Sequence, residues 1–115
     1  MDTTQSRKSK PEKNRENPMT QKISATTWVY VLVQNPGGDE QIVGQQDTRD
    51  DITFIPTFLD KDSAMQGVVH MVKEQGKKFE IQAIIYEDLA GYAAREGFIL
   101  MVLDGQGQVI DKLAP

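Results

Sequence analysis

The sequence predicts an α+β fold, in which two helices pack on one mixed sheet of five to six strands. Three observations favour this class: dense runs of β-branched and aromatic residues, two stretches with apolar residues at helical spacing, and glycine- or aspartate-rich turns between them. A chain of 115 residues is long enough for one domain. We expect the order β-β-β-α-β-α-β-β, in a single domain over residues 26–115.

Three strands are expected before the first helix. The run TTWVYVLVQN, residues 26–35, is apolar on both alternating faces, which is typical of a central strand. The turn NPGGDE and the weaker run QIVGQQ, residues 41–46, predict a hairpin. The run ITFIPTF, residues 52–58, contains Pro56, which removes a backbone donor, so we expect this strand to lie near a sheet edge or to end at Pro56.

The first helix is expected in DKDSAMQGVVHMVKEQGKK, residues 60–78, with Asp60 as its N-cap and Gly76 just past its end. Its apolar face would hold Ala64, Met65, Val68, Val69, Met71 and Val72.

The second half of the chain predicts strand, helix, strand and strand. The run FEIQAIIY, residues 79–86, alternates apolar and polar residues at its start, as a strand with one wet face does. A helix of about three turns follows and ends at Gly97. The run FILMVLD is a strand that is apolar on both faces, and VIDKL returns after the turn DGQGQ.

Composition excludes several classes of chemistry. The chain has no cysteine, so thiol catalysis, disulfides and thiolate metal sites are absent. No apolar run reaches the roughly 18 residues that a membrane span needs, and the N-terminus has no apolar core typical of a secretory signal. We therefore expect a cytoplasmic protein that does not bind a membrane.

Charge is distributed unevenly along the chain. Residues 1–26 carry a net charge of +3, whereas the remaining residues carry −7. Residues 1–25 hold almost no large apolar side chains, so we expect a disordered, mildly basic tail. Nucleic-acid association through this tail is one alternative, although the tail lacks aromatic residues that stack on bases and the acidic remainder disfavours phosphate binding.

The strongest enzyme-like cluster lies in IIYEDLAGYAAREGF, residues 84–98. At about 100° per residue, Glu87 and Asp88 diverge around the helix and do not face one reacting centre. We interpret both acids as partners of the positive helix N-terminus, and Arg95 as a partner of the C-terminus. A second alternative is a small-molecule-binding or weakly catalytic domain, with a pocket where strand ends meet this helix, near Tyr86, Glu87 and Tyr92.

His70 is the single histidine of the chain. The helical pattern places it opposite the apolar face, and Ser63 lies two turns away, roughly 10 Å, which is too far for a hydrogen bond. Zinc needs several nitrogen or sulfur ligands, and the acidic loops lack the spacing of a calcium loop. The sequence therefore predicts no catalytic residues, no metal and no cofactor.

Large, adaptable side chains remain as candidates for contact with other proteins. Aromatic residues and methionine are favoured at interfaces. We name four interaction candidates, and the alternative for each is that it fills the core of a small domain: Trp28, Tyr30, Met71 and Met101.

Two resemblances to known families rest on longer runs. The run VYVLVQNPGGDEQIVGQQ resembles the opening of a small uncharacterised family of cyanobacteria and plastids, whose members begin with a VYVLLFN-type strand. ITFIPTFLDKDSAM together with IQAIIYEDLAGYAAREGFILMVLDGQG is similar to the N-terminal domain of the SseB-type, enhanced serine sensitivity, family. Here Thr57 precedes Phe58, where that family has the hydroxyl residue after phenylalanine, and Leu103–Asp104 replaces its Asn-Pro. Each resemblance covers about residues 27–113 and implies a small mixed domain that acts through other proteins.

Taken together, these features predict a non-catalytic protein-interaction or regulatory domain. Its partner would be another protein or a second copy of the chain, because a domain of about 90 residues buries only some 60–65% of its unfolded surface and gains from association.

Overall fold

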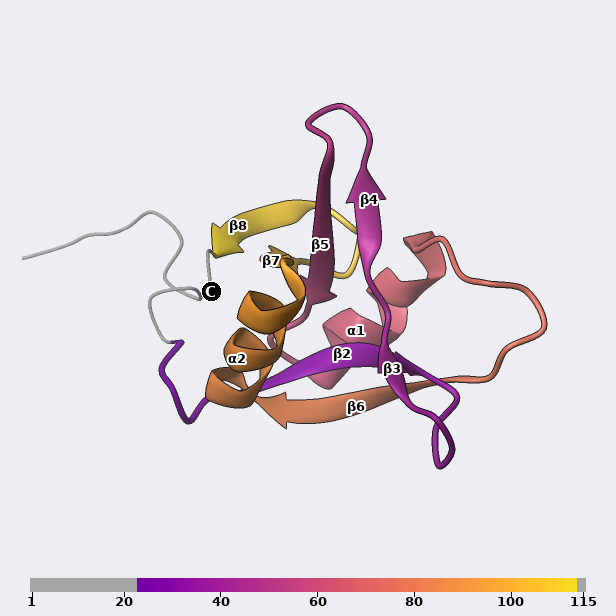
Figure 1. Ribbon diagram of the computed structural model, residues 1–115. Coiled ribbons are helices and arrows are strands. Elements are labelled where there is room, and N and C mark those ends of the chain that lie inside the picture. The colour runs from indigo at the N-terminus through magenta and orange to yellow at the C-terminus, as the bar shows by residue number, and fades with distance from the viewer. Residues whose placement is uncertain (1–22, 114–115) are drawn as a thin grey trace, which may run out of the picture.

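The computed structural model describes residues 23–113, so most of the expected tail lies outside the described part of the chain. The predicted α+β class is confirmed, and the elements follow the predicted order except that the second expected strand is divided into two, β3 and β4 (Figure 1). The elements are β2 (Trp28–Gln34), β3 (Gln41–Ile42), β4 (Gln45–Asp47), β5 (Ile52–Thr57), α1 (Lys61–Gly67), the 3-10 turn η3 (Val68–His70), β6 (Phe79–Ile85), α2 (Tyr86–Glu96), β7 (Ile99–Leu103) and β8 (Val109–Leu113).

The strands form two sheets, where the sequence led us to expect one. The first sheet has the order β3-β2-β6 and is antiparallel, and the second has the order β4-β5-β7-β8 with β5 and β7 parallel. One backbone bridge joins the sheets: Tyr30 N donates to Phe58 O at 2.8 Å, and Phe58 N donates to Tyr30 O at 2.9 Å. The two sheets therefore meet where β2 passes the end of β5.

The run QIVGQQ contributes to both sheets, which explains why the structure has two sheets instead of the predicted one. Its first part, β3, pairs with β2, whereas its second part, β4, pairs with β5. Val43 and Gly44 lie between them, and Val43 N donates to Leu32 O at 2.9 Å. The expected hairpin strand is thus a crossover from one sheet to the other.

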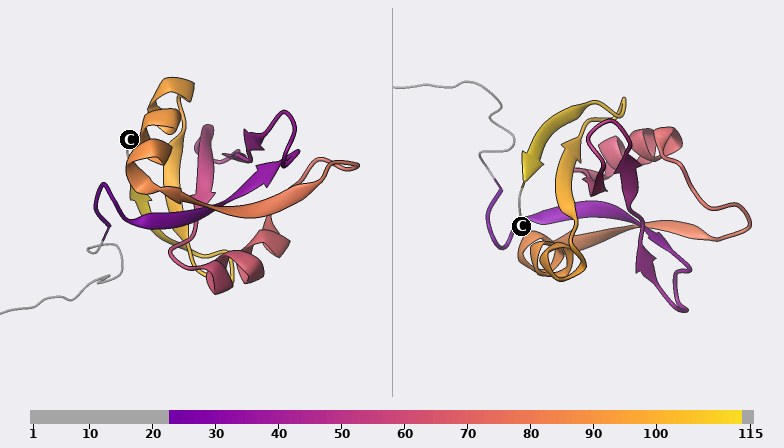
Figure 2. Two further views of the ribbon diagram at one scale, coloured as in Figure 1. Left: turned by 90° about the horizontal axis from the view of Figure 1, so that it is seen from below. Right: turned by 45° about the horizontal axis from the view of Figure 1, so that its top comes forward.

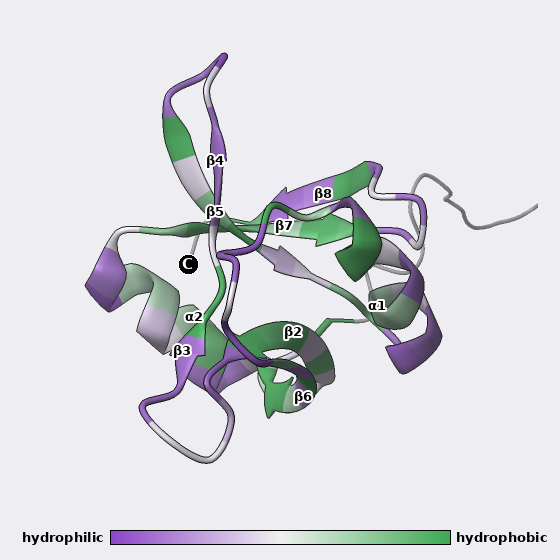
Figure 3. Cartoon of the chain, turned by 90° about the vertical axis from the view of Figure 1, so that its right-hand side faces the viewer, coloured by the Kyte–Doolittle hydropathy of each residue, from purple (hydrophilic) through white to green (hydrophobic). Residues whose placement is uncertain are grey.

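The two helices lie on opposite sides of the β2–β6 pair (Figure 2). Val29, Val31 and Val33 point to one face, where they pack with Leu89 and Ala93 of α2. Leu32 points to the other face and packs with Phe58, Met101 and Ala64 of α1. Strand β7 is apolar along its length and much of β2 is apolar, whereas the turn between β4 and β5 is hydrophilic (Figure 3).

The first helix is shorter than predicted. Asp60 is its N-cap as expected, since Asp60 Oδ1 accepts from Ser63 N at 2.8 Å. The helix ends at Gly67, however, and the 3-10 turn ends at His70. Beyond it, the backbone N–H and C=O of Val72 bond the side-chain amide of Gln45 at 2.8 and 2.7 Å. Met71 has an extended backbone, and Val72 lies outside the helix with its backbone bonded to Gln45.

The predicted apolar face of this helix is therefore wrong in part. Ala64 and Met71 are buried, but Met65, Val69 and Val72 are exposed, with Val72 81% exposed. Gly76 takes a positive φ of 81°, but it lies in a separate turn and does not end the helix.

The second helix follows the prediction. It ends at Gly97, which has a left-handed φ of 79°, and its first turn carries Glu87 and Asp88. Arg95 lies in its last turn, and Leu89 is fully buried.

The residues just before β2 are hydrogen-bonded to the first residues of α2. Ala25, at the end of the expected tail, accepts a hydrogen bond from Glu87 N at 3.0 Å, and Thr27 O accepts from Tyr86 N at 2.8 Å. Within residues 23–113, no helix is long and apolar enough to cross a membrane.

Candidate functional site

The ionisable side chains of the described residues do not gather into a reaction centre. His70 lies at a hollow of about 120 Å³ whose other lining residues are not ionisable. Ser63 Oγ donates to Asp60 Oδ2 at 3.1 Å, so its hydroxyl belongs to the helix cap. Between Ile23 and Leu113, no three histidine, aspartate or glutamate side chains form a group that could hold a metal ion.

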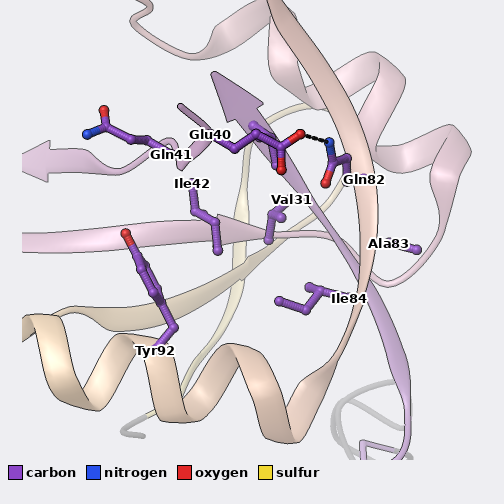
Figure 4. Close-up of a pocket in the computed structure, with 9 residues that line it drawn as sticks. Val31, Glu40, Gln41, Ile42, Gln82, Ala83, Ile84 and Tyr92 are labelled. Carbon is purple, nitrogen blue, oxygen red and sulfur yellow. Dashed lines mark hydrogen bonds between the residues drawn. The ribbon is translucent and has the colours of Figure 1, made fainter. Parts of the chain in front are cut away.

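A larger groove of about 310 Å³ lies beside α2 on the β2–β6 sheet (Figure 4). Its floor is apolar, and polar groups lie at its rim. Glu40 Oε2 accepts from Gly37 N at 2.8 Å and from Gln82 Nε2 at 3.4 Å, so the turn before β3 is tied across the sheet to β6. The lining residues are Val31, Val33, Glu40, Gln41, Ile42, Gln82, Ala83, Ile84 and Tyr92.

Of the three pocket candidates, only Tyr92 lines this groove. Tyr86 is half-buried against the core, and Glu87 is exposed at the start of α2. The groove lies further along the sheet than the pattern of strand ends had suggested. Glu40 and Gln82 were missed, because their approach depends on β2 pairing with both β3 and β6.

Partial burial changes the acidity of Tyr92. Burial raises its pKa above the ordinary 10.0 of tyrosine, the nearby charge of Glu96 raises it further, and Arg95 lowers it. The tyrosine hydroxyl is therefore held in its neutral form, which can donate or accept a hydrogen bond at the groove.

This pKa shift predicts how Tyr92 affects stability at high pH. Because the folded chain holds the phenolic proton more tightly, the contribution of Tyr92 is fully present below pH 10 and is lost as pH rises through the raised value. In Tyr92→Phe this loss is absent. Urea-unfolding midpoints of both proteins, measured from about pH 8 to about pH 11, should show the wild-type midpoint falling relative to that of Tyr92→Phe above pH 10. Glu96→Gln should remove part of the effect, and parallel profiles for wild type and Tyr92→Phe would contradict it.

The four interaction candidates divide into two groups. Met71 and Met101 lie in the core, with Met101 only 2% exposed. They therefore fill the core, which was the alternative to an interaction surface. Tyr30 is half-buried and packs against the same core. Trp28 is 56% exposed at the start of β2, where it pairs with Ile85 of β6.

Beside Trp28 lies the open edge of the first sheet. Tyr30 directs its backbone groups toward Phe58, so its neighbours Val29 and Val31 direct theirs toward β6. They pair with Ile84 and Gln82. The alternate residues of β6 therefore turn their backbone groups away from β2: Phe79, Ile81, Ala83 and Ile85.

No strand of the described chain pairs with this side of β6. Figure 1 shows β6 along the lower border of the molecule, with β2 on its inner side. The edge ends at Glu87, whose backbone N–H donates to Ala25 O. We call the outward side of Phe79–Ile85 the β6 edge.

The β6 edge is the least protected of the sheet edges that the described residues form. Natural sheets protect edges with short strands, charges or proline. Strands β3 and β4 have two and three residues, and β8 carries Asp111 and Lys112. In contrast, β6 has seven residues, no proline and one charged residue, Glu80.

The side chains above this edge are apolar. Phe79, Ile81, Ala83 and Ile85 share one face of the sheet with Trp28. The alternation of apolar residues in the sequence predicted this face, and Trp28 was one of the four interaction candidates. It could not identify the open side of β6, because that depends on which strands become neighbours.

Comparisons with known proteins add no assignment: no protein-family model matches the chain, and neither a curated protein nor a solved structure matches it.

Proposed function

We propose that this protein is a non-catalytic protein-interaction domain that binds an extended strand of its partner along the β6 edge. The observation that carries the proposal is the row of outward backbone groups of Ile81 and Ala83 in a seven-residue edge strand. An added strand would satisfy these donors and acceptors, and main-chain hydrogen bonds supply affinity in this mode of recognition.

Exposed side chains support the same surface. Trp28 of β2 is exposed and lies beside the partly buried Ile85 of the edge strand, on one face of the sheet. Tryptophan is enriched among residues that dominate binding energy, because its large ring buries much apolar area.

A peptide without tryptophan tests the proposal directly. The probe is a synthetic peptide of residues 77–88, KKFEIQAIIYED. Trp28 is the single tryptophan of the chain, so its fluorescence reports events at the β6 edge. We expect a saturable change of its emission as the peptide strand docks beside Ile85, the direct neighbour of Trp28.

The control is a chain in which the edge cannot accept a strand. Ala83→Pro removes an outward N–H that the β2–β6 ladder does not use, and proline is tolerated at such edge positions. Ala83→Lys keeps the N–H but adds a charge of the kind that protects natural edges. Both variants should fold, as judged by circular dichroism, and should not bind the peptide. Equal binding by Ala83→Lys, or no binding by a monomeric wild-type chain at about 1 mM peptide, would refute the proposal.

A second candidate function is small-molecule binding in the groove beside α2. The volume of about 310 Å³ and the half-buried Tyr92 favour it. A metabolite screen by thermal shift tests it, since a ligand that binds the folded state raises the melting temperature. A genuine groove ligand should lose this effect in Glu40→Gln or Tyr92→Phe, whereas a ligand that is unaffected by both would contradict this candidate.

A further inference from the structure

The β6 edge is complementary to itself, and we infer that its partner is a second copy of this chain. The two β6 strands would pair antiparallel about a twofold axis through Gln82, giving a six-stranded sheet with the order β3-β2-β6-β6-β2-β3. This inference rests on the proposed function and identifies the partner of the same surface.

The alternation of the backbone selects the register. Only residues with outward backbone groups can exchange hydrogen bonds, so Ile81 and Ala83 must face residues of the same kind in the second copy. This condition places the twofold axis on a residue and not between two. Full overlap of Phe79–Ile85 then selects Gln82. Ile81 of each copy faces Ala83 of the other, and Phe79 faces Ile85.

Charge selects the antiparallel direction. Lys77 and Lys78 precede β6, and Glu87 and Asp88 follow it at the start of α2; all four are exposed. In the antiparallel register, the end of β6 that carries Lys77 and Lys78 in one copy lies beside the end that carries Glu87 and Asp88 in the other. A parallel arrangement would place like charges together, which opposes association. The two ends of β6 are therefore complementary only when the strands run in opposite directions.

The apolar face continues across the axis. Trp28 and Ile85 lie side by side in one copy, and the register adds Phe79 of the second copy as the next residue in that row. Aromatic and β-branched neighbours on adjacent strands stabilise a sheet. One added strand pair forms a small interface, so we expect dissociation in the micromolar range or weaker.

Cross-linking through an introduced cysteine tests the register, because the natural chain contains none. In Gln82→Cys the two thiols would meet at the twofold axis, where opposed residues without mutual hydrogen bonds have Cα atoms about 4.5 Å apart. That separation suits a disulfide. We expect Gln82→Cys to form a covalent dimer under mild oxidation at about 50 μM protein.

Gln46→Cys is the matched control, since Gln46 is an exposed glutamine on the edge strand of the other sheet. It should form far less dimer. Adding Ala83→Lys to Gln82→Cys should slow its cross-linking to the rate of Gln46→Cys. If Gln82→Cys cross-links no faster than Gln46→Cys, or if Ala83→Lys has no effect, the inference is overturned.

Sedimentation of chains without cysteine tests the charge pairing. We expect concentration-dependent dimers for wild type and about tenfold weaker association for Lys77→Glu, because attraction becomes repulsion at two symmetric places. Adding Glu87→Lys to Lys77→Glu should restore association. Failure of the double variant to recover, when both single variants associate weakly, would overturn the antiparallel register.

The outcomes separate this inference from the proposed function. If wild type binds the 77–88 peptide but remains monomeric, and Gln82→Cys does not cross-link, the second copy is overturned as the partner and strand binding is left intact. Chains that neither bind the peptide nor self-associate would overturn both.

Discussion

Phe58→Ala is expected to lower the free energy of unfolding by about 3–5 kcal/mol, the range for removing a fully buried aromatic ring. The ring of Phe58 is 0% exposed and packs with Leu32 and Met101 between the two sheets and α1. Alanine would leave a cavity at the point where these three layers meet. Domains of this size have a total stability of about 5–15 kcal/mol, so the loss would be a large fraction of it.

The backbone of Phe58 should not contribute to this loss. Its two hydrogen bonds with Tyr30 join the sheets through main-chain atoms, which alanine also supplies. The effect therefore measures side-chain packing. Urea unfolding followed by circular dichroism, at one fixed protein concentration, gives the change in midpoint.

Phe54→Ala is the matched control, because Phe54 packs against the same core but is only partly buried. Part of its ring already contacts water, so its removal should cost less. A loss for Phe58→Ala that is no larger than the loss for Phe54→Ala would contradict the central packing position of Phe58.

Elements with local determinants could be predicted from the sequence. Helix α2 is an example: the acids of its first turn, the buried position of Leu89 and the terminal Gly97 all lie within the helix or next to it. Helix α1 shows the limit. Its N-cap, Asp60, is local and was predicted, but its end depends on Gln45, 27 residues before Val72. The amphipathic pattern in the sequence continues past the end of α1. Periodicity alone cannot show that the side chain of Gln45, distant in the sequence, binds the backbone of Val72.

The candidate site shows the same division. The apolar face of β6 follows from strand alternation, whereas the exposure of Trp28 does not, because the sequence left open whether Trp28 fills the core. The open side of β6 follows only from the order of strands in the sheet, and the bridge between Tyr30 and Phe58 determines which backbone groups point outward. The split of QIVGQQ between two sheets was equally hidden, since both halves are compatible with one strand.

Gly67→Ala is expected to lower the free energy of unfolding by about 1–3 kcal/mol, as overpacking of a core does. In an exposed helix position the same change would raise stability by up to about 1 kcal/mol. Gly67 ends α1 against the ring of Phe58, and an added Cβ would lie 2.7 Å from Phe58 Cζ and 3.2 Å from Asp104 O. The backbone oxygen cannot move aside as a flexible side chain can.

Gly91→Ala provides the comparison with the opposite sign. Gly91 lies inside α2, and an added Cβ there would meet only the flexible end of Arg95 at 3.6 Å. Stability should rise by about 0.5–1 kcal/mol, because alanine favours the helix and reduces the freedom of the unfolded chain. Phe58→Leu should make Gly67→Ala less harmful, and a double-mutant cycle would measure this coupling. If both glycine substitutions stabilised the chain, α1 would pack less closely on Phe58 than the distances require, and the contact that fixes α1 on the sheet would lie elsewhere.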